Sequence, residues 1–207
     1  MYKRQSDLRV SIIKADLDTI AKSVWMEKVR RLSLRGKLGD DGFAELVAIP
    51  RLAKLEALNV TAAGIGVGIG KLEGHLPNLT SLVLTANELG TKGLAALVKW
   101  RGLPKLERLF LSNCDLADED IATLANIKFP KLAKLTLSGN ALGTTAATSL
   151  AGSAKNFPAL EILELQGTEI DDAGATALAK AKFPELVKID LRGTSVETSA
   201  DARVVYL

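Results

Sequence analysis

The sequence has almost none of the residues that build disulfides, metal sites and nucleophilic active sites. It contains one cysteine, Cys114, and one histidine, His75. A single cysteine cannot form an internal disulfide, which favours a reducing compartment, so we expect a cytoplasmic protein. One histidine and one cysteine are too few for a zinc site, and because His75 does not lie near Cys114 in the sequence we expect no Cys-His pair and no Ser-His pair. We therefore expect no metal, no cofactor and no catalytic residue.

The sequence also lacks a long apolar run and an N-terminal signal peptide. Asp7, Arg9 and Lys14 interrupt the first residues, where a signal peptide would need an unbroken apolar core. No stretch reaches the length that a membrane-spanning helix requires, so we expect no membrane span. Aromatic residues make up only 4% of the chain, against 47% hydrophobic residues in total. This composition predicts a core of layered aliphatic side chains.

Positive charge is concentrated near the N-terminus. Ten Lys and Arg and four acids precede residue 38, a net charge of +6, although the whole chain carries only +3. A basic end is typical of a solvated cap, but it can also attract an acidic partner or nucleic acid. Aromatic residues are not interleaved with these charges, so we do not expect nucleic acid to be the partner.

One short pattern recurs along most of the chain. It is clearest in the segment 130–142, PKLAKLTLSGNAL, which reads L-x-x-L-x-L-x-x-N-x-L. This pattern is typical of a repeat that consists of one strand followed by a helix. Eight candidate strands follow from it, with their first apolar members 24 to 28 residues apart. They are centred on Leu8 and Val10, Leu32 and Leu34, Leu58 and Val60, Leu82 and Leu84, Leu109 and Leu111, Leu135 and Leu137, Leu163 and Leu165, and Ile189 and Leu191.

The segments between the strands predict helices and packing contacts. Alanine-rich windows lie at 94–99, 118–125, 144–154 and 171–179. We expect the acids and threonine at helix starts to cap the free N–H groups there. Three strands are preceded by Phe-Pro, and we expect Phe129, Phe157 and Phe183 to stack repeat on repeat. The expected capping residues are Asp40, Asp41, Asp118, Glu119, Asp120, Thr144, Asp171 and Asp172.

Small polar residues occupy one fixed position after most of the strands. A side chain at this position can bond the turn backbone between neighbouring repeats. Cys114 occupies it as well, so we expect this cysteine to be structural rather than nucleophilic. The expected structural ladder is Asn87, Cys114, Asn140, Thr168 and Thr194.

The segment 62–74 departs from the repeat pattern. Its GIGVGIGK has the glycines of a phosphate loop without their spacing, and Leu72 follows Lys71 where a Walker loop needs Ser or Thr. The Rossmann fingerprint G-x-G-x-x-G is not matched either. Four glycines oppose a helix by about 1 kcal/mol each. We therefore expect a shortened, weakly helical segment, and this is where we expect any bend in the array of repeats.

Together these residues resemble the leucine-rich repeat superfamily, and in particular the helical subclass typified by ribonuclease inhibitor. LTLSGNALGTTAATSLA and LELQGTEIDDAGATALA carry the resemblance, which covers residues 29–194. It implies an α/β fold, a right-handed leucine-rich repeat solenoid with a parallel sheet on the concave face and helices on the convex face. It also implies a protein-binding scaffold, although one branch of the superfamily activates small GTPases.

We expect a single leucine-rich repeat domain over residues 1–207, present as a monomer. Residues 1–28 are expected to be an N-terminal cap or degenerate repeat whose open end Trp25 seals. Residues 29–194 hold about seven repeats of 24–28 residues, and 195–207 form a C-terminal cap or a truncated end. Solenoids need such caps because each repeat buries its faces only against neighbours.

The resemblance and the strand pattern together locate a candidate binding face. Strand leucines point into the core, so the residues between them point out from the concave sheet. Val83 and Phe110 are then adjacent apolar residues with a polar rim, the composition of a small hot spot. We expect a protein or peptide to place an apolar residue there and an acidic end toward Arg31 and Arg35. The expected partner-binding residues are Arg31, Arg35, Asn59, Val83, Thr85, Phe110, Ser112, Thr136, Glu164 and Asp190.

The alternative is a regulator that activates a small GTPase through an exposed Arg or Asn at a strand end. Arg35 and Arg108 are the candidates for this role, although the chain has no acidic C-terminal tail of the kind that this branch carries. Catalysis by the chain's own groups is not expected. Its paired carboxylates fall at predicted helix starts, and His75 lies in the irregular glycine segment.

Overall fold

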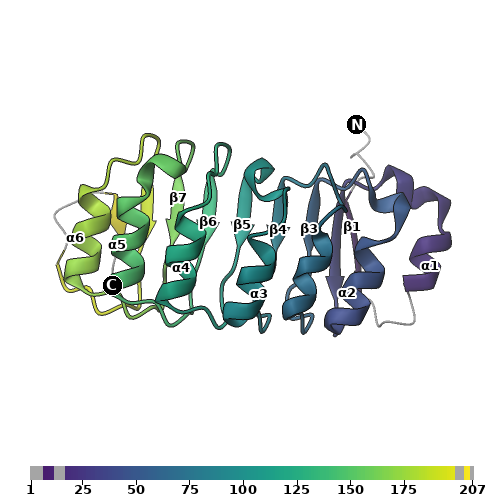
Figure 1. Ribbon diagram of the computed structural model, residues 1–207, viewed down its shortest axis with the longest axis horizontal. Coiled ribbons are helices and arrows are strands. Elements are labelled where there is room, and N and C mark those ends of the chain that lie inside the picture. Colours follow the sequence, from purple (N-terminus) through teal and green to yellow (C-terminus); the bar gives the residue numbers. More distant parts are fainter. Residues whose placement is uncertain (1–6, 12–16, 199–202, 206–207) are drawn as a thin grey trace.

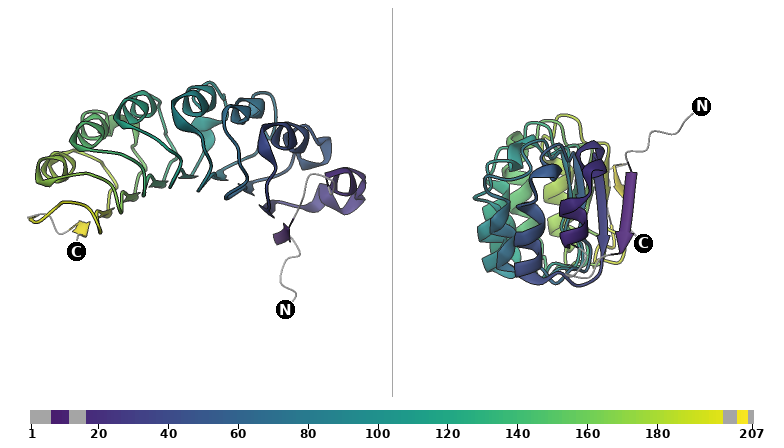
Figure 2. Two further views of the ribbon diagram at one scale, coloured as in Figure 1. Left: turned by 90° about the horizontal axis from the view of Figure 1, so that it is seen from below. Right: turned by 90° about the vertical axis from the view of Figure 1, so that its right-hand side faces the viewer.

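The parallel sheet is the inner layer of an arc (Figures 1 and 2). The computed structural model describes residues 7–11, 17–198 and 203–205. Within these residues nine parallel strands pair in sequence order. The expected α/β solenoid and its eight strands are confirmed. The strands are β1 (Asp7–Ser11), β2 (Arg31–Arg35), β3 (Ala57–Asn59), β4 (Ser81–Val83), β5 (Arg108–Phe110), β6 (Lys134–Thr136), β7 (Ile162–Glu164), β8 (Lys188–Asp190) and β9 (Val204–Val205).

Helices form the outer, convex layer of the arc, as Figure 2 shows. The α-helices are α1 (Leu17–Lys22), α2 (Gly39–Val47), α3 (Gly90–Leu97), α4 (Asp118–Ala125), α5 (Thr144–Gly152) and α6 (Asp172–Lys180). Shorter 3₁₀ turns are η2 (Val24–Lys28), η3 (Pro50–Leu52), η4 (Val67–Leu72), η5 (Leu103–Lys105) and η6 (Ala154–Asn156). The expected helical windows and the weakly helical glycine segment, which forms η4, are confirmed.

The glycine segment is thin because it must fit between two full helices. The turn η4 packs against both α2 and α3. A Cβ atom added to Gly68 would lie 2.6 Å from Cβ of Asp40, closer than two carbon atoms can approach. Glycine at this position therefore allows the turn to lie directly on the start of α2.

Strand register places equivalent apolar residues in one buried row. The first strand leucine of each repeat pairs with its counterpart in the next. Each repeat thus buries its own leucine against two neighbours, and one continuous core results. The row consists of Leu32, Leu58, Leu82, Leu109, Leu135, Leu163 and Ile189, all at most 1% exposed.

A second row of apolar contacts runs beneath the loops that return to the strands. The ring of Phe129 stacks on that of Phe157 with centroids 5.4 Å apart. The ring of Phe157 lies 6.4 Å from that of Phe183 in a tilted arrangement. The expected stacking of the phenylalanines is confirmed, and it joins the last three full repeats.

Buried asparagines bond the loops that follow the strands. The Oδ1 atom of Asn140 accepts hydrogen bonds from the amides of Cys114 and Leu116, at 2.8 and 3.2 Å. Its Nδ2 atom donates to the carbonyl oxygens of Leu111 and Leu137, at 2.8 and 2.7 Å. One side chain therefore satisfies four backbone groups in two successive repeats.

The other polar side chains at this position make different sets of bonds. Asn87 repeats the arrangement with the amides of residues 63 and 65 and the carbonyls of residues 60 and 84. The hydroxyls of Thr168 and Thr194 donate to the carbonyl oxygens of Leu165 and Leu191, the residues that directly follow β7 and β8. The asparagines therefore join repeats, whereas these threonine bonds close the local turn.

In seven repeats the residue just before this position has left-handed backbone geometry. This position turns the chain sharply at the end of the strand, a conformation that glycine adopts without strain. Three repeats nevertheless carry alanine or asparagine there, which the sequence analysis did not identify. The residues are Gly36, Ala62, Ala86, Asn113, Gly139, Gly167 and Gly193, with φ between 52° and 119°.

Acids at the helix starts join neighbouring repeats, which differs in part from the expected capping. Asp171 caps its own helix, because its side chain accepts from the amide of Gly174. Asp40 and Asp118 instead accept from backbone amides of the following repeat, at residues 66 and 143. Asp172 likewise accepts from the amide of residue 197, at 2.8 Å. These carboxylates hold successive loops together along one edge of the arc.

The two ends differ from expectation in specific ways. The expectation that Trp25 seals the N-terminal end is wrong, because its side chain is 49% exposed and Met26 is fully buried instead. The C-terminal segment forms β9, which pairs with β8 and which the sequence did not predict. Residues 1–6 and 12–16 of the expected N-terminal cap, and 199–202 and 206–207 of the C-terminal one, lie outside the described residues.

We predict that Asn140→Ala lowers the free energy of unfolding by about 3 kcal/mol or more, because several buried backbone groups lose their partner together. Thr168→Ala removes one hydroxyl bond at the equivalent position and should cost about 1 kcal/mol. Urea unfolding followed by circular dichroism measures both values. Equal losses in the two variants would contradict the bridging role of the asparagine.

Candidate functional site

Side chains that alternate with the buried leucines form the concave surface. Each strand contributes one residue before, one between and one after its two core residues, as alternation along a strand requires. Because the strands pair in register, these residues form three rows that cross the sheet. From β2 to β8 the first row is Arg31, Ala57, Ser81, Arg108, Lys134, Ile162 and Lys188, and Asp7 of β1 pairs with Arg31 in the register.

A groove lies on the concave surface over β2, β3 and β4. It encloses about 610 Å³ and is lined by residues of these strands and the turns after them, among them Arg31, Arg35, Asn59 and Val83. Among the lining residues that the structure describes, none is acidic. Four expected site residues therefore meet in one depression, which we call the β2–β4 groove.

The polar groups of this groove are mainly hydrogen-bond donors. The Oδ1 atom of Asn59 accepts from the amide and the hydroxyl of Thr61, at 2.9 and 2.7 Å. This arrangement directs the NH₂ group of Asn59 away from Thr61. Arg31 and Arg35 add guanidinium donors. The groove is thus suited to a ligand rich in acceptors, such as carboxylates or peptide carbonyls.

The expected apolar pair lies next to the groove. Val83 and Phe110 are partners in the register of β4 and β5, and both are half-buried. The ammonium group of Lys134 lies 5.7 Å from the centroid of the Phe110 ring. Glu164 holds this lysine through an ion pair of 2.6 Å. The ring therefore presents an apolar surface beside a fixed positive charge.

Lys134 is a candidate site residue that was not among the expected ones. It occupies the position before the first strand leucine, in the row that also contains Arg31 and Arg108. The alternation of side chains along a strand gives this position the same outward direction as the positions after it. The strand periodicity is therefore the sequence signal from which the outward direction of Lys134 could be predicted.

Other expected site residues have their side chains engaged or buried. Thr85 and Ser112 are half-buried on the concave face. Thr136 is only 2% exposed, and its hydroxyl lies 3.3 Å from that of Ser112. Asp190 is fully buried. Thr136 and Asp190 therefore offer almost no side-chain surface to a partner.

Asp190 is the centre of a charge cluster at the C-terminal end of the face. Its carboxylate lies 2.8 Å from the ammonium of Lys188 and 2.9 Å from the guanidinium of Arg192. Burial tends to raise the pKa of Asp190, but the hydrogen bonds from Arg192 and Lys188 outweigh it and hold the pKa well below its usual range. The carboxylate is therefore ionised at neutral pH and holds both cations on the surface.

We predict that Asp190→Asn lowers the free energy of unfolding by about 2 kcal/mol at pH 7, because charge-assisted hydrogen bonds are lost. The folded-state pKa is lowered, so the stabilisation is present above the unfolded-state pKa of about 4 and is lost as the pH falls below it. Urea unfolding of both proteins between pH 7 and pH 3 measures the difference. A difference that does not shrink with acid would exclude this linkage.

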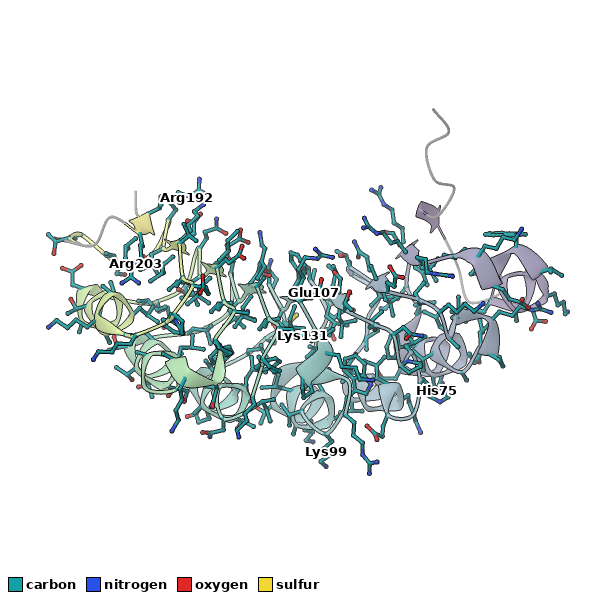
Figure 3. All side chains as sticks on the ribbon, turned by 90° about the horizontal axis from the view of Figure 1, so that it is seen from above. His75, Lys99, Glu107, Lys131, Arg192 and Arg203 are labelled. Atoms are coloured by element: carbon teal, nitrogen blue, oxygen red, sulfur yellow. The ribbon has the colours of Figure 1, made fainter. Side chains whose placement is uncertain are left out.

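The two residues most suited to catalysis, His75 and Cys114, are not among the residues that line the groove. Figure 3 shows His75 on the convex side. Cys114 is buried, and its thiol donates to the carbonyl oxygen of Leu84 at 3.2 Å. Burial raises the pKa of this thiol to about 11. Among the described residues, no group of three or more His, Cys, Asp or Glu could hold a metal ion.

We predict that Cys114 does not react with a thiol reagent in the native protein at pH 8, because only the thiolate is nucleophilic and the buried thiol stays protonated. In urea the thiol should react at the rate of an ordinary cysteine. Labelling rates with and without urea measure this contrast. Rapid labelling of the folded protein would show that the thiol is accessible.

Comparisons with known proteins support the repeat architecture. Residues 75–98 and 158–179 match the family described as Leucine Rich repeat. Among curated proteins, none matches the chain at a significant level. An internalin-like protein of Listeria monocytogenes is similar in structure, with a TM-score of 0.59, 14% identity, and coverage of 97% of this chain and 57% of that one. This chain thus spans little more than half of that structure's length.

Two further solved structures are similar at lower scores. InlP of Listeria monocytogenes has a TM-score of 0.46 and 16% identity, over 89% of this chain and 44% of that one. The plant peptide hormone receptor RGFR1, in complex with RGF2, has a TM-score of 0.45 and 15% identity, over 95% of this chain and 31% of that one. In the part of the chain that the structure describes, no helix has the length and apolarity needed to cross a membrane.

Proposed function

We propose that this chain, a leucine-rich repeat solenoid, is a non-catalytic scaffold that binds a protein or a peptide on the concave face of its sheet. One observation carries the proposal. The donor-lined β2–β4 groove runs directly into the apolar pair formed by Val83 and Phe110. An apolar anchor with a polar rim is the arrangement that concentrates binding energy at protein interfaces.

The finer assignments of the same proposal rest on further features. Full α-helices on the convex side of repeats 24 to 28 residues long favour the ribonuclease-inhibitor-like subclass. The continuous core supports a single domain. We assign the chain to the cytoplasm because its one cysteine is buried and free.

We propose a monomeric state because the large apolar side chains that are exposed among the described residues are distributed along the chain, with only Val24 and Trp25 in the same element. They are Val24, Trp25, Val67, Val187 and Val205.

We predict that the double variant Val83→Ser and Phe110→Ser binds its partner at least about thirtyfold more weakly, the effect of losing one strong hot spot. The control is Trp25→Ser with Val67→Ser, which also exchanges one aromatic residue and one valine, both exposed and away from the groove. Capture from a lysate of the source organism identifies the partner, and titration gives the affinities. Equal affinities for the two double variants would remove the concave face from the proposal.

Activation of a small GTPase is the second candidate function. Its supporting observation is that Arg35 and Arg108 are exposed, as an arginine inserted into a partner's nucleotide site must be. A captured GTPase whose hydrolysis rate rises with the wild-type protein, and not with Arg35→Ala or Arg108→Ala, would favour this function over a passive scaffold.

A further inference from the structure

We infer that one edge of the arc, the edge at which the strands begin, docks on the surface of an anionic lipid bilayer. The concave face takes no part in this contact, so the inference is independent of the proposed function. It follows from the separation of charge between the two edges of the arc, from lysines without partners, and from apolar side chains exposed on the same edge.

The alternation of strands and helices gives the arc two edges. Because all strands are parallel, every strand begins at one edge and ends at the other. The segments that lead from the end of a helix, or of η4, back to the next strand therefore lie along the edge where the strands begin, which we call the returning edge. Its segments are 22–31, 47–57, 71–81, 98–108, 126–134, 152–162 and 180–188.

Charge is separated between the two edges. The returning edge carries 18 Lys and Arg against 6 Glu, a net charge of +12. The segments that lead from the strands through the helices carry 4 Lys and Arg against 12 Asp and Glu, a net charge of −8. These segments are 35–46, 61–70, 85–97, 112–125, 138–151, 166–179 and 192–197.

The helix dipole accounts for only part of this separation. Cations in the last turn of a helix are stabilised by the negative end of its dipole. Seven of the 18 cations of the returning edge occupy such a position in an α-helix or a 3₁₀ turn. The larger share therefore has no role in helix stability and is available to attract an anionic surface.

The lysines of the returning edge are open to a ligand, whereas its arginines are engaged within the chain. Three of the five arginines form ion pairs with glutamates, Arg108 contacts the hydroxyl of Ser81, and Arg31 is also engaged. Nine lysines are exposed, and their Nζ atoms have no hydrogen-bond or ion-pair partner among the described residues. They are Lys28, Lys54, Lys71, Lys99, Lys128, Lys131, Lys155, Lys180 and Lys182. An ammonium group attracts lipid headgroups without a fixed geometry, which suits a fluid bilayer.

Apolar side chains are exposed at both ends of the same edge. Val24 and Trp25 are 69% and 49% exposed in η2, at the N-terminal end of the arc. Val187 is 67% exposed directly before β8, at the C-terminal end. Tryptophan favours the boundary between headgroups and acyl chains. Exposed apolar residues beside lysines are therefore the combination that binds a protein to a bilayer surface.

The returning edge is continuous and level. Its loops are joined across repeats, because Arg51 donates to the carbonyl oxygen of Ala21 at 3.0 Å, and Asn78 donates to that of Ala53 at 2.8 Å. Figure 1 shows the loops of each edge at nearly one level along the arc, and Figure 2 shows the curvature in the perpendicular view. The edge is thus a crescent that can lie on a flat surface, with the concave face upright and open to a partner.

A bilayer fits this edge better than a nucleic acid does. Nucleic-acid sites combine arginines that bind phosphates with aromatic side chains on which bases stack. Here the arginines are engaged within the chain. Trp25 is the only exposed aromatic residue in the described segments of the edge, and it lies at one end. The row of lysines therefore has no stacking platform within it.

Co-sedimentation of the wild-type protein with vesicles tests the inference. We expect binding to vesicles of phosphatidylcholine and phosphatidylserine in a two-to-one ratio, weak binding to phosphatidylcholine alone, and loss of binding as salt screens the charges. Lys54→Glu with Lys131→Glu should bind anionic vesicles at least about tenfold more weakly, because each lysine near the surface adds to the attraction.

The matched control is Lys37→Glu with Lys92→Glu. It changes the net charge by the same amount, and both lysines are exposed but lie outside the returning edge. This variant should bind anionic vesicles within about threefold of the wild-type protein, because charges far from the bilayer are screened. Circular dichroism and thermal unfolding verify that both double variants are folded.

Tryptophan fluorescence locates the contact. Trp25 is exposed, whereas Trp100, the other tryptophan, is only 4% exposed. Lipids brominated in their acyl chains should quench the fluorescence of the wild-type protein on anionic vesicles. The quenching should be lost in Trp25→Phe, which keeps an aromatic side chain for binding. Fluorescence of the bound wild-type protein that brominated lipids leave unchanged would contradict contact between this edge and the bilayer.

The remaining outcomes separate the inference from the proposed function. Equal binding of the two charge-reversal variants, equal binding to neutral and anionic vesicles, or no binding to vesicles would overturn the inference. DNA or polyglutamate that binds the returning edge while vesicles do not would assign this edge to another polyanion. Val83→Ser with Phe110→Ser should bind vesicles like the wild-type protein, and loss of vesicle binding in this variant would overturn the docking geometry. None of these results removes the concave-face scaffold, which is tested by partner binding alone.

Discussion

Each repeat of this protein needs its neighbours to satisfy its own buried backbone. The amides that follow one strand find their acceptor in an asparagine of the next repeat, as Asn87 and Asn140 show. In the opposite direction, Asp40 and Asp118 accept from amides of the repeat that follows them. Burying such groups without partners costs more than the bonds themselves return, so no repeat is stable in isolation. The register of the sheet, and with it the concave surface, follows from this mutual dependence.

The arc and its concave face follow from the unequal widths of the two layers. Neighbouring strands lie about 4.8 Å apart, whereas packed helices need about 8 to 10 Å. The chain must therefore curve with its sheet on the inside (Figure 2). Side chains from distant parts of the sequence converge there, so Arg31 and Val83 come to line one groove. The repeat that supplies β3 has the thin turn η4 on its convex side. Its concave side forms part of the β2–β4 groove.

The sequence predicted the elements whose buried residues recur at a fixed period. It did not predict the burial of single residues that depends on one local contact. The strand leucines were predictable because each must face the core at a fixed period. In the N-terminal turn, Met26 rather than Trp25 faces inward, and periodicity cannot distinguish two adjacent apolar residues in a short 3₁₀ turn. For the candidate site, the facing direction of Val83 and Phe110 was predictable. The burial of Asp190 was not, because it depends on two cations that cover it.

The left-handed residue in the turn after each strand also limits which insertions and deletions the repeats can accept. Ala86 and Gly139 hold the same position in their repeats, and each sets the direction of the polar side chain that follows it. Removing a few residues between them would move every later side chain to the wrong register, leaving amides without acceptors. Removing one whole repeat would bring equivalent partners together again. The protein can therefore lengthen or shorten its arc in whole repeats, while small insertions and deletions are confined to loops outside the bonded turns.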